Sequence, residues 1–266
     1  PEHLTIVVAN GTHIGGDEQE LRTLVTDGVY NRVRVKNHDC EAKDLAYLGT
    51  TPHETPVWID RTAAEADLVV CLGAATHHVM AGFGGGRKSI LPGISGRETI
   101  FHNHAFSGNP LHEDMCEAAS LVNNLFMVNL VMNADMKLSY IFSGHYLTSW
   151  ERACTAVDDI YRVDIPCRAD AVVTSCGGFP KDISLYQGTK TIDNVESALK
   201  PGGTLVLFIE APEGGGPAEY FDWSKNLQDG TLEQRLREAF TVAGYIFFLN
   251  CEQAQRYRIF LYSSID

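Results

Sequence analysis

Short apolar runs alternate with amphipathic segments along most of the chain. Residues 4–9 form a β-branched, apolar run that ends at the turn Asn10-Gly11-Thr12-His13, and a helical pattern follows over Glu18–Val25 with Asp17 as its expected N-cap. Further strands are predicted at residues 29–35, 56–60, 66–72, 126–131 and 137–142, with a polar loop over residues 36–55. Helices are predicted at residues 61–66, 113–122 and 148–163, the last capped by Thr148 or Ser149, and Asn109-Pro110 is predicted to form a turn.

The pattern restarts after residues 164–169, which form the best candidate linker. Strands are predicted at residues 171–175, 204–209, 245–249 and 258–261, and helices at residues 193–200 and 231–242. Strands that alternate with helices favour a parallel sheet. The sequence therefore predicts an α/β protein of two units with mainly parallel sheets and a cleft between them. Residues 1–165 would be a catalytic and cofactor unit, incomplete at its N-terminus, and residues 166–266 a Rossmann-like unit.

Composition narrows the class of partner. The 266 residues carry a net charge of −13, so a nucleic acid or an anionic membrane surface is not expected as a partner. No apolar run reaches the roughly 20 residues that a membrane span requires. The seven cysteines lack C-x-x-C spacing and several lie in apolar runs, which favours reduced thiols and a cytoplasmic location.

The densest chemistry lies between residues 77 and 104, where two histidine pairs flank a glycine-rich loop that carries Arg87 and Lys88. Glycines allow a backbone to approach a ligand closely, and imidazoles offer metal ligation or proton transfer near neutral pH. His13 and His78 both follow predicted strand ends, where α/β sheets bind ligands. Any one of these histidines could equally be a hydrogen-bonded structural residue, but the whole set indicates an active site.

Two familiar glycine motifs do not fit this loop. A P-loop requires glycine directly before the lysine, and here Arg87 intervenes. The glycines also miss the spacing of a dinucleotide-binding fingerprint. Zinc-dependent hydrolysis by the histidines is the weakest alternative, because no carboxylate stands at the spacing of H-E-x-x-H.

A positioned lysine can serve as a nucleophile, a covalent attachment point or a phosphate contact, and Lys88 sits in a segment whose backbone is expected to be pinned. A further cluster spans residues 177–190, directly after a predicted strand of the second unit. Tyr186 and Lys190 are four residues apart there, so on a helix they would share one face.

With these residues in view, the sequence resembles the lactate racemase family that uses a nickel-pincer nucleotide. The resemblance runs across nearly the whole chain and is carried by Gly11-Thr12-His13, by His78-x-x-Ala81-Gly82-Phe83-x-Gly85-Gly86-Arg87-Lys88-Ser89-Ile90-Leu91-Pro92-Gly93, by Glu98-Thr99-Ile100 with Asn103-His104, by Gly108-Asn109-Pro110, and by Gly177-Gly178-Phe179-Pro180-Lys181-Asp182 with Tyr186-Gln187-x-x-Lys190. The central block is specific for the family and not for one substrate.

The resemblance implies a role for each matching residue. Lys88 would hold the nucleotide covalently through a thioamide, and His104 would be the protein ligand to nickel. His13 and His78 would be acid/base catalysts on opposite faces of the substrate, and Lys190 would hold or polarise the substrate carboxylate. The remaining implied cofactor-binding residues are Arg87, Gly85, Gly86, Tyr186 and Gln187.

The implied reaction is racemisation or epimerisation of a lactate-like 2-hydroxy acid, by hydride transfer to the tethered cofactor and return to the other face of a 2-keto acid. Its partners would be the small hydroxy acid and the proteins that make the cofactor. The alternative, from another class, is a non-catalytic module of the same fold that binds a nucleotide or a hydroxy acid.

The sequence departs from the family pattern at four points. Ile14 stands where the family usually has arginine after the first histidine, and His77 stands where proline is common. The family's N-terminal Asp-x-Thr-Arg-Pro segment is absent, and the chain stops early after residues 259–262. From these departures we expect a chain trimmed at its N-terminus.

Overall fold

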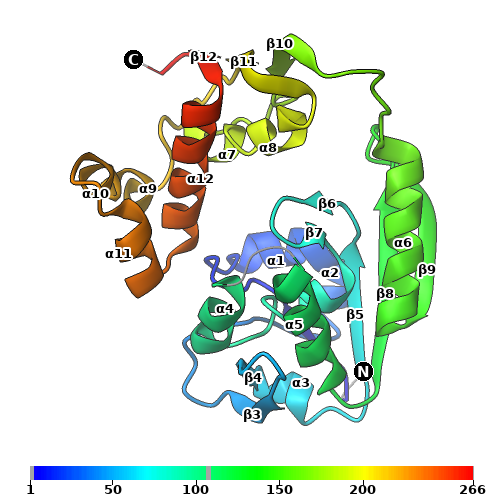
Figure 1. The fold of residues 1–266 in the computed structure, drawn as a ribbon. Coiled ribbons are helices and arrows are strands. Elements are labelled where there is room, and N and C mark those ends of the chain that lie inside the picture. Colours follow the sequence, from blue (N-terminus) through cyan, green and yellow to red (C-terminus); the bar gives the residue numbers. More distant parts are fainter. Residues whose placement is uncertain (1–2, 106–108, 266) are drawn as a thin grey trace. The chain divides into compact units, whose positions relative to one another are not determined.

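The computed structural model describes residues 3–105 and 109–265, and the chain forms two compact units, Pro1–Arg162 and Val163–Asp266 (Figure 1). The structural division falls three residues before the predicted boundary at 165. The catalytic and Rossmann-like roles assigned to the two units, and the cleft between them, stay predictions. Gly108, which belongs to one of the family motifs, lies outside the described residues.

The chain enters the first unit as predicted. Strand β1 (Thr5–Val8) pairs in parallel with β2 (Arg34–Asn37), and helix α1 (Glu18–Val25) lies between them in the sequence. The expected cap is confirmed, because the Asp17 carboxylate accepts a hydrogen bond from the Glu20 amide at 2.9 Å while the Glu20 side chain accepts one from the Asp17 amide at 2.8 Å.

Two predictions in the next segment are wrong. The predicted strand at residues 29–35 is instead the end of helix α2 (Asp27–Tyr30) followed by β2, which begins only at Arg34. The predicted polar loop contains β3 (Ala46–Thr50), which pairs antiparallel with β4 (Pro56–Ile59). None of the β3 residues is fully buried, so this strand lacks the apolar alternation that would have marked it.

A mixed sheet forms the frame of the first unit. Its order is β5-β8-β9, in which β5 (Val69–Ala74) and β8 (Leu125–Met132) are parallel while β8 and β9 (Leu138–His145) form an antiparallel hairpin. Helix α6 (Tyr146–Tyr161) packs along β8 and β9 (Figure 1). Its cap is His145 and not Thr148 or Ser149, since Ser149 is buried and accepts a hydrogen bond from Asn129 of β8.

The segment that carries most candidate residues lies between β5 and β8. It comprises the hairpin of β6 (His77–His78) and β7 (Gly82–Phe83), the 3-10 helix η1 (Gly86–Ser89), α4 (Arg97–His104) and α5 (Asn109–Ser120). Helix α3 (Arg61–Ala64) lies just before β5. The predicted turn at Asn109-Pro110 is the first turn of α5, where proline's missing N–H is not needed.

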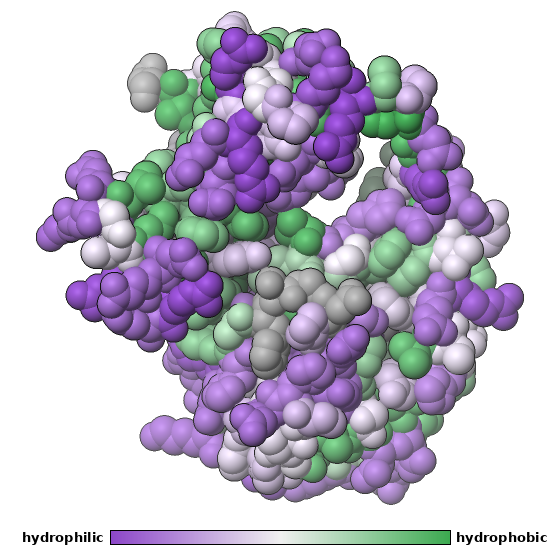
Figure 2. Space-filling view, in the orientation of Figure 1, coloured by the Kyte–Doolittle hydropathy of each residue, from purple (hydrophilic) through white to green (hydrophobic). Residues whose placement is uncertain are grey.

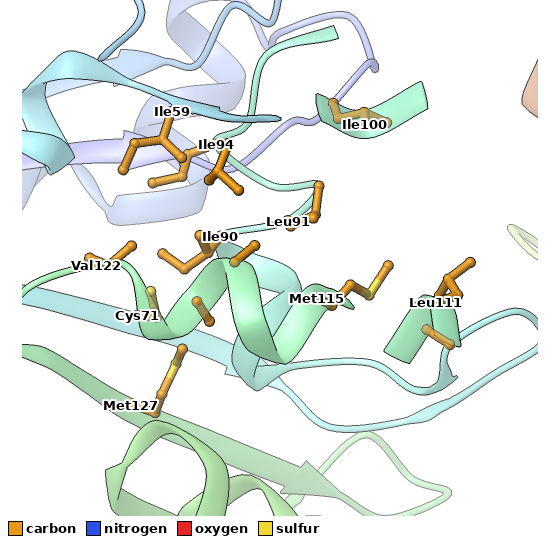
Figure 3. Close-up of a cluster of buried hydrophobic side chains, with 14 residues drawn as sticks. Ile59, Cys71, Ile90, Leu91, Ile94, Ile100, Leu111, Met115, Val122 and Met127 are labelled. Atoms are coloured by element: carbon orange, nitrogen blue, oxygen red, sulfur yellow. The ribbon is translucent and has the colours of Figure 1, made fainter. Parts of the chain in front are cut away.

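The core of the first unit surrounds the residues that follow η1 (Figure 3). Ile90 and Leu91 are completely buried, and they belong to one hydrophobic cluster with side chains from β4, β5, α4, α5 and β8. The chain directly after Lys88 is therefore anchored in the core.

The second unit is a parallel three-stranded sheet with the order β10-β11-β12, formed by Ala169–Ser175, Leu199–Phe208 and Arg258–Tyr262. Its helices are α7 (Leu185–Gly188), α8 (Thr191–Glu196), α9 (Ala218–Asp222), α10 (Ser224–Gln228), α11 (Leu232–Glu238) and α12 (Val242–Arg256). The predicted strand at residues 245–249 is wrong, because this run belongs to α12. A short apolar run can be a buried helix segment as easily as a strand.

The α/β class is confirmed. Parallel pairing holds throughout the second unit, while the first unit combines parallel and antiparallel pairs. Some large apolar side chains remain exposed, and Figure 2 shows hydrophobic residues at the surface among polar ones. Within the described residues, every helix is too short or too polar to cross a bilayer.

Candidate active site

Backbone hydrogen bonds connect the turn that carries His13 to the segment that carries Lys88, residues 88–93. The His13 amide donates to the Asn10 carbonyl at 3.0 Å, and the Gly11 amide donates to the Gly93 carbonyl at 2.9 Å. Gly93 in turn donates to the Lys88 carbonyl at 3.0 Å. His13 itself is exposed and lines a groove with Thr12, Asn37, Cys40 and Arg97, among others. The His13 side chain is therefore exposed to solvent, and its turn is linked to the Lys88 backbone through Gly93.

His78 is held by the turn that follows it. Its Nδ1 accepts hydrogen bonds from the amides of Met80 at 3.3 Å and Ala81 at 3.2 Å. An accepting Nδ1 places the proton of the neutral ring on Nε2. In this orientation Nε2 of His78 carries the proton and acts as a donor. Nε2 can accept a proton only if the ring's own proton moves to Nδ1, which requires the ring to turn over or the Met80–Ala81 turn to move.

The glycines before Lys88 are required by their surroundings. Gly85 has φ +70°, and a Cβ on it would lie 3.0 Å from the Ala74 carbonyl oxygen. Gly86 has φ +54°, and its Cβ would lie 2.7 Å from the Trp150 ring. Their contribution is thus to shape the loop, whatever ligand it binds.

Replacing Gly86 by alanine is expected to destabilise the protein by about 2–4 kcal/mol, from the left-handed backbone and the clash with Trp150. Urea unfolding measures this change in the free energy of unfolding. Gly28→Ala is the matched control, because Gly28 lies in α2 with no neighbour within 4 Å, and it should be neutral or slightly stabilising. Equal effects of the two substitutions would contradict this account of Gly86.

Arg87 is 1% exposed and makes its contacts inside the protein. It donates to the Phe83 carbonyl at 2.8 Å, to the Ala81 carbonyl at 2.7 Å and to His112 Nδ1 at 3.1 Å. Its guanidinium carbon lies 3.9 Å from the centre of the Trp150 ring. Burial lowers the pKa of Arg87 to about 10, so it remains charged at neutral pH. The cofactor-binding role that the resemblance implies for Arg87 stays a prediction.

Lys88 and His104 lie near each other. Burial, and to a smaller extent the charge of Lys88, lower the pKa of His104 to about 4 despite the opposing effect of a hydrogen bond to the Ile100 carbonyl. That bond, from Nδ1–H at 2.9 Å, leaves the lone pair of the neutral ring on Nε2. His104 is therefore neutral at physiological pH and oriented as a metal-binding imidazole is.

This pKa makes the cofactor-free protein sensitive to acid. The unfolded chain protonates His104 near pH 6.5 while the folded protein resists until about pH 4, so stability is lost as the pH falls between these values. The loss should reach about 3 kcal/mol by pH 4, of which about 2 kcal/mol falls between pH 7 and pH 5. Urea unfolding at pH 7 and pH 5 measures it, and His104→Gln should reduce the difference between the two. A His104→Gln protein with the wild-type pH dependence would contradict the assignment.

Two histidines left without a role by the sequence have structural ones. His77 Nε2 lies 2.8 Å from an Asp158 carboxylate oxygen, which ties the β6–β7 hairpin to α6. His112 accepts the hydrogen bond from Arg87 and stacks at 5.0 Å from Trp150. Neither Trp150 nor Asp158 could be connected to the loop from sequence spacing.

The zinc alternative gains nothing from the geometry. Among the described residues, three potential ligands converge at His53, Asp114 and Glu117, and this group includes none of the candidate histidines. His53 pairs there with Glu117 at 2.8 Å, and Asp114 accepts from Thr51 and Thr55. This group links the β3–β4 turn to α5.

In the second unit the structure brings Tyr186, Gln187 and Lys190 together. The Lys190 ammonium donates to Gln187 Oε1 at 2.8 Å and lies 4.6 Å from the centre of the Tyr186 ring. Burial lowers the pKa of Lys190. Ser184 caps α7, which carries Tyr186 and Gln187. The lysine is thus held among partners of its own unit.

Comparison with known proteins follows this division of the chain. Residues 1–113 match the family model of the lactate racemase N-terminal domain, and residues 165–243 match that of the lactate racemase C-terminal domain. The chain is 33% identical to a lactate racemase of Thermoanaerobacterium thermosaccharolyticum over 85% of its length, and 30% identical to one of Lactiplantibacillus plantarum over 82%. It spans about half the length of these relatives, 56% and 54% respectively.

Solved structures agree. The lactate racemase apoprotein of Thermoanaerobacterium thermosaccharolyticum superimposes with a TM-score of 0.91 at 30% identity, over 98% of this chain and 67% of that one. A Thermotoga maritima protein shares the fold with a TM-score of 0.71 at 19% identity, over 98% of this chain and 76% of that one. The family domains, the sequence identity and the close superposition together show that this chain belongs to the lactate racemase family.

Proposed function

We propose that the protein is an isomerase that racemises or epimerises a lactate-like 2-hydroxy acid, with a nickel-pincer nucleotide tethered to Lys88. Family membership supports the reaction class. The observation that carries the cofactor proposal is the neutral His104 imidazole, which is oriented by the Ile100 carbonyl and lies within electrostatic range of Lys88.

The residues present fit that group. Lys88 offers a primary amine on a backbone fixed by Gly85, by Gly93 and by the core that follows it, so a tethered group would be held in one place. His104 offers an imidazole nitrogen, a donor that suits nickel, with its ring oriented by the Ile100 carbonyl. When bound, the group supplies the acceptor and donor of hydride, which no amino-acid side chain can provide.

The remaining roles fall to the protein's own side chains. His13 and His78 exchange the hydroxyl proton of the substrate, one for each enantiomer. The exposure of His13 supports a direct role, while His78 acts once its ring is released from the Met80–Ala81 turn. Lys190 holds the substrate carboxylate, and Gln187 and Tyr186 keep its ammonium oriented.

A chiral assay tests this function. The protein is produced together with the cofactor-biosynthesis proteins, which we propose as its partners, and incubated with single enantiomers of a panel of 2-hydroxy acids. Chromatographic appearance of the opposite enantiomer is the expected result. Binding of a hydroxy acid or nucleotide without any inversion would instead support the non-catalytic module. The cytoplasmic location stays a prediction.

A further inference from the structure

The buried guanidinium of Arg87 links the hairpin that carries His78 to the 3-10 helix that carries Lys88. Arg87 donates to the carbonyls of Ala81 and Phe83, which belong to the turn and second strand of the β6–β7 hairpin. A buried charge is costly unless it is hydrogen-bonded, and these charge-assisted bonds stabilise the hairpin in return. The position of the hairpin therefore depends on Arg87.

The same turn sets the state of His78. The Ala81 residue uses both of its peptide groups, since its carbonyl accepts from Arg87 at 2.7 Å while its amide donates to His78 Nδ1 at 3.2 Å. If the turn moves, the amides of Met80 and Ala81 leave Nδ1, and the ring is free to carry its proton there. The chain of contacts from Arg87 to the His78 tautomer is two hydrogen bonds long.

On its other side Arg87 is fixed by two helices. Its guanidinium stacks on Trp150 of α6 and donates to His112 of α5. Trp150 also donates from Nε1 to the Gly84 carbonyl at 2.9 Å, so it holds the loop on either side of Gly85 and Gly86. Lys88 is the next residue after Arg87 and is itself in η1. Its placement is thus fixed by the same contacts.

From this geometry we propose that Arg87 is a positioning residue that sets both the tautomer of His78 and the placement of Lys88. The proposal rests on the proposed function for the roles of those two residues, and its geometric content stands without that function. Lysine could not replace Arg87, because the three acceptors match the planar fork of a guanidinium and not a single ammonium.

The test uses the cofactor-free chain and two measurements. The ¹⁵N chemical shifts of the His78 ring report which nitrogen carries the proton, and peptide mass spectrometry reports how fast acetic anhydride modifies Lys88. In Arg87→Met we expect the ¹⁵N chemical shift of His78 Nδ1 to move away from the value of an unprotonated nitrogen. We also expect the rate of Lys88 acetylation to change about fivefold, which corresponds to the loss of about 1 kcal/mol of restraint. The control is Arg152→Lys. Arg152 is an exposed arginine of α6 that stacks on Phe142, and its substitution should leave the His78 shift and the Lys88 acetylation rate unchanged.

A second variant separates positioning from general loosening. Trp150→Phe keeps a ring under Arg87 but removes the donor to Gly84, so the Lys88 rate should change while the His78 tautomer stays. If Arg87→Met does not fold, Arg87→Lys decides the same question with the same two measurements. A folded Arg87 variant with the wild-type His78 tautomer and the wild-type rate of Lys88 acetylation would overturn the proposal. A Trp150→Phe protein in which the His78 tautomer changes as much as the Lys88 acetylation rate would also overturn it. Neither measurement needs cofactor or nickel, so the result is independent of whether the proposed racemase activity is found.

Discussion

A Lys88→Arg protein is expected to fold normally and to show no racemase activity above that of cofactor-free enzyme. Arginine keeps the positive charge of the side chain, but a guanidinium cannot form the thioamide that we propose for Lys88. The surroundings tolerate the change, because Lys88 is only partly buried and its backbone bonds to Gly85 and Gly93 do not involve the side chain. Chiral chromatography after co-production with the cofactor-biosynthesis proteins measures the activity, and circular dichroism checks the fold.

The matched control is Lys200→Arg. Lys200 is exposed and pairs with Asp170 at 2.8 Å, so this substitution should leave activity unchanged. Substantial activity in folded Lys88→Arg would exclude a covalent tether at this position.

Substituting either proposed proton-transfer histidine should slow racemisation by about 100- to 10,000-fold. Because the equilibrium constant between enantiomers is one, each variant, His13→Asn or His78→Asn, must lower kcat/KM by the same factor for the two enantiomers. The two variants differ in a partial reaction. Each should still form 2-keto acid from one enantiomer and fail with the other, and the enantiomer that remains active should be opposite in the two variants.

Acid quenching of loaded enzyme with each enantiomer, followed by detection of the 2-keto acid, measures this partial reaction. His102→Asn serves as control, because His102 is exposed in α4 and has no proposed role. Two variants that lose the same enantiomer, or that keep both, would contradict the division of labour between His13 and His78.

Local signals explain which elements could be predicted. Asp17 and Glu20 specify the start of α1 within four residues, and the β8–β9 hairpin has long apolar strands on either side of a polar turn. The failures lie where tertiary packing decides. Residues 245–249 are apolar without interruption because α12 buries Ile246 and Phe247 and partly buries the rest of the run. Strand β3 is inconspicuous in the sequence and forms by pairing with β4.

The candidate site divides in the same way. The density of glycine and histidine marks the loop and names Lys88, His104, His13 and His78 as residues of interest. Sequence could not give Arg87 its structural place, because the ring that stacks on it comes from Trp150, 63 positions away (150 − 87). The orientation of His104 likewise depends on burial and on the Ile100 carbonyl, which no motif records.

The proposed anchor and the proposed metal ligand can be tested in one measurement. Wild-type and His104→Ala proteins are each produced with the cofactor-biosynthesis proteins, and peptide mass spectrometry and nickel content are determined on the same samples. We predict added mass on the Lys88 peptide in both proteins, with nickel in the wild type and little in His104→Ala. Wild-type protein with an unmodified Lys88 peptide and no nickel would contradict the assignment.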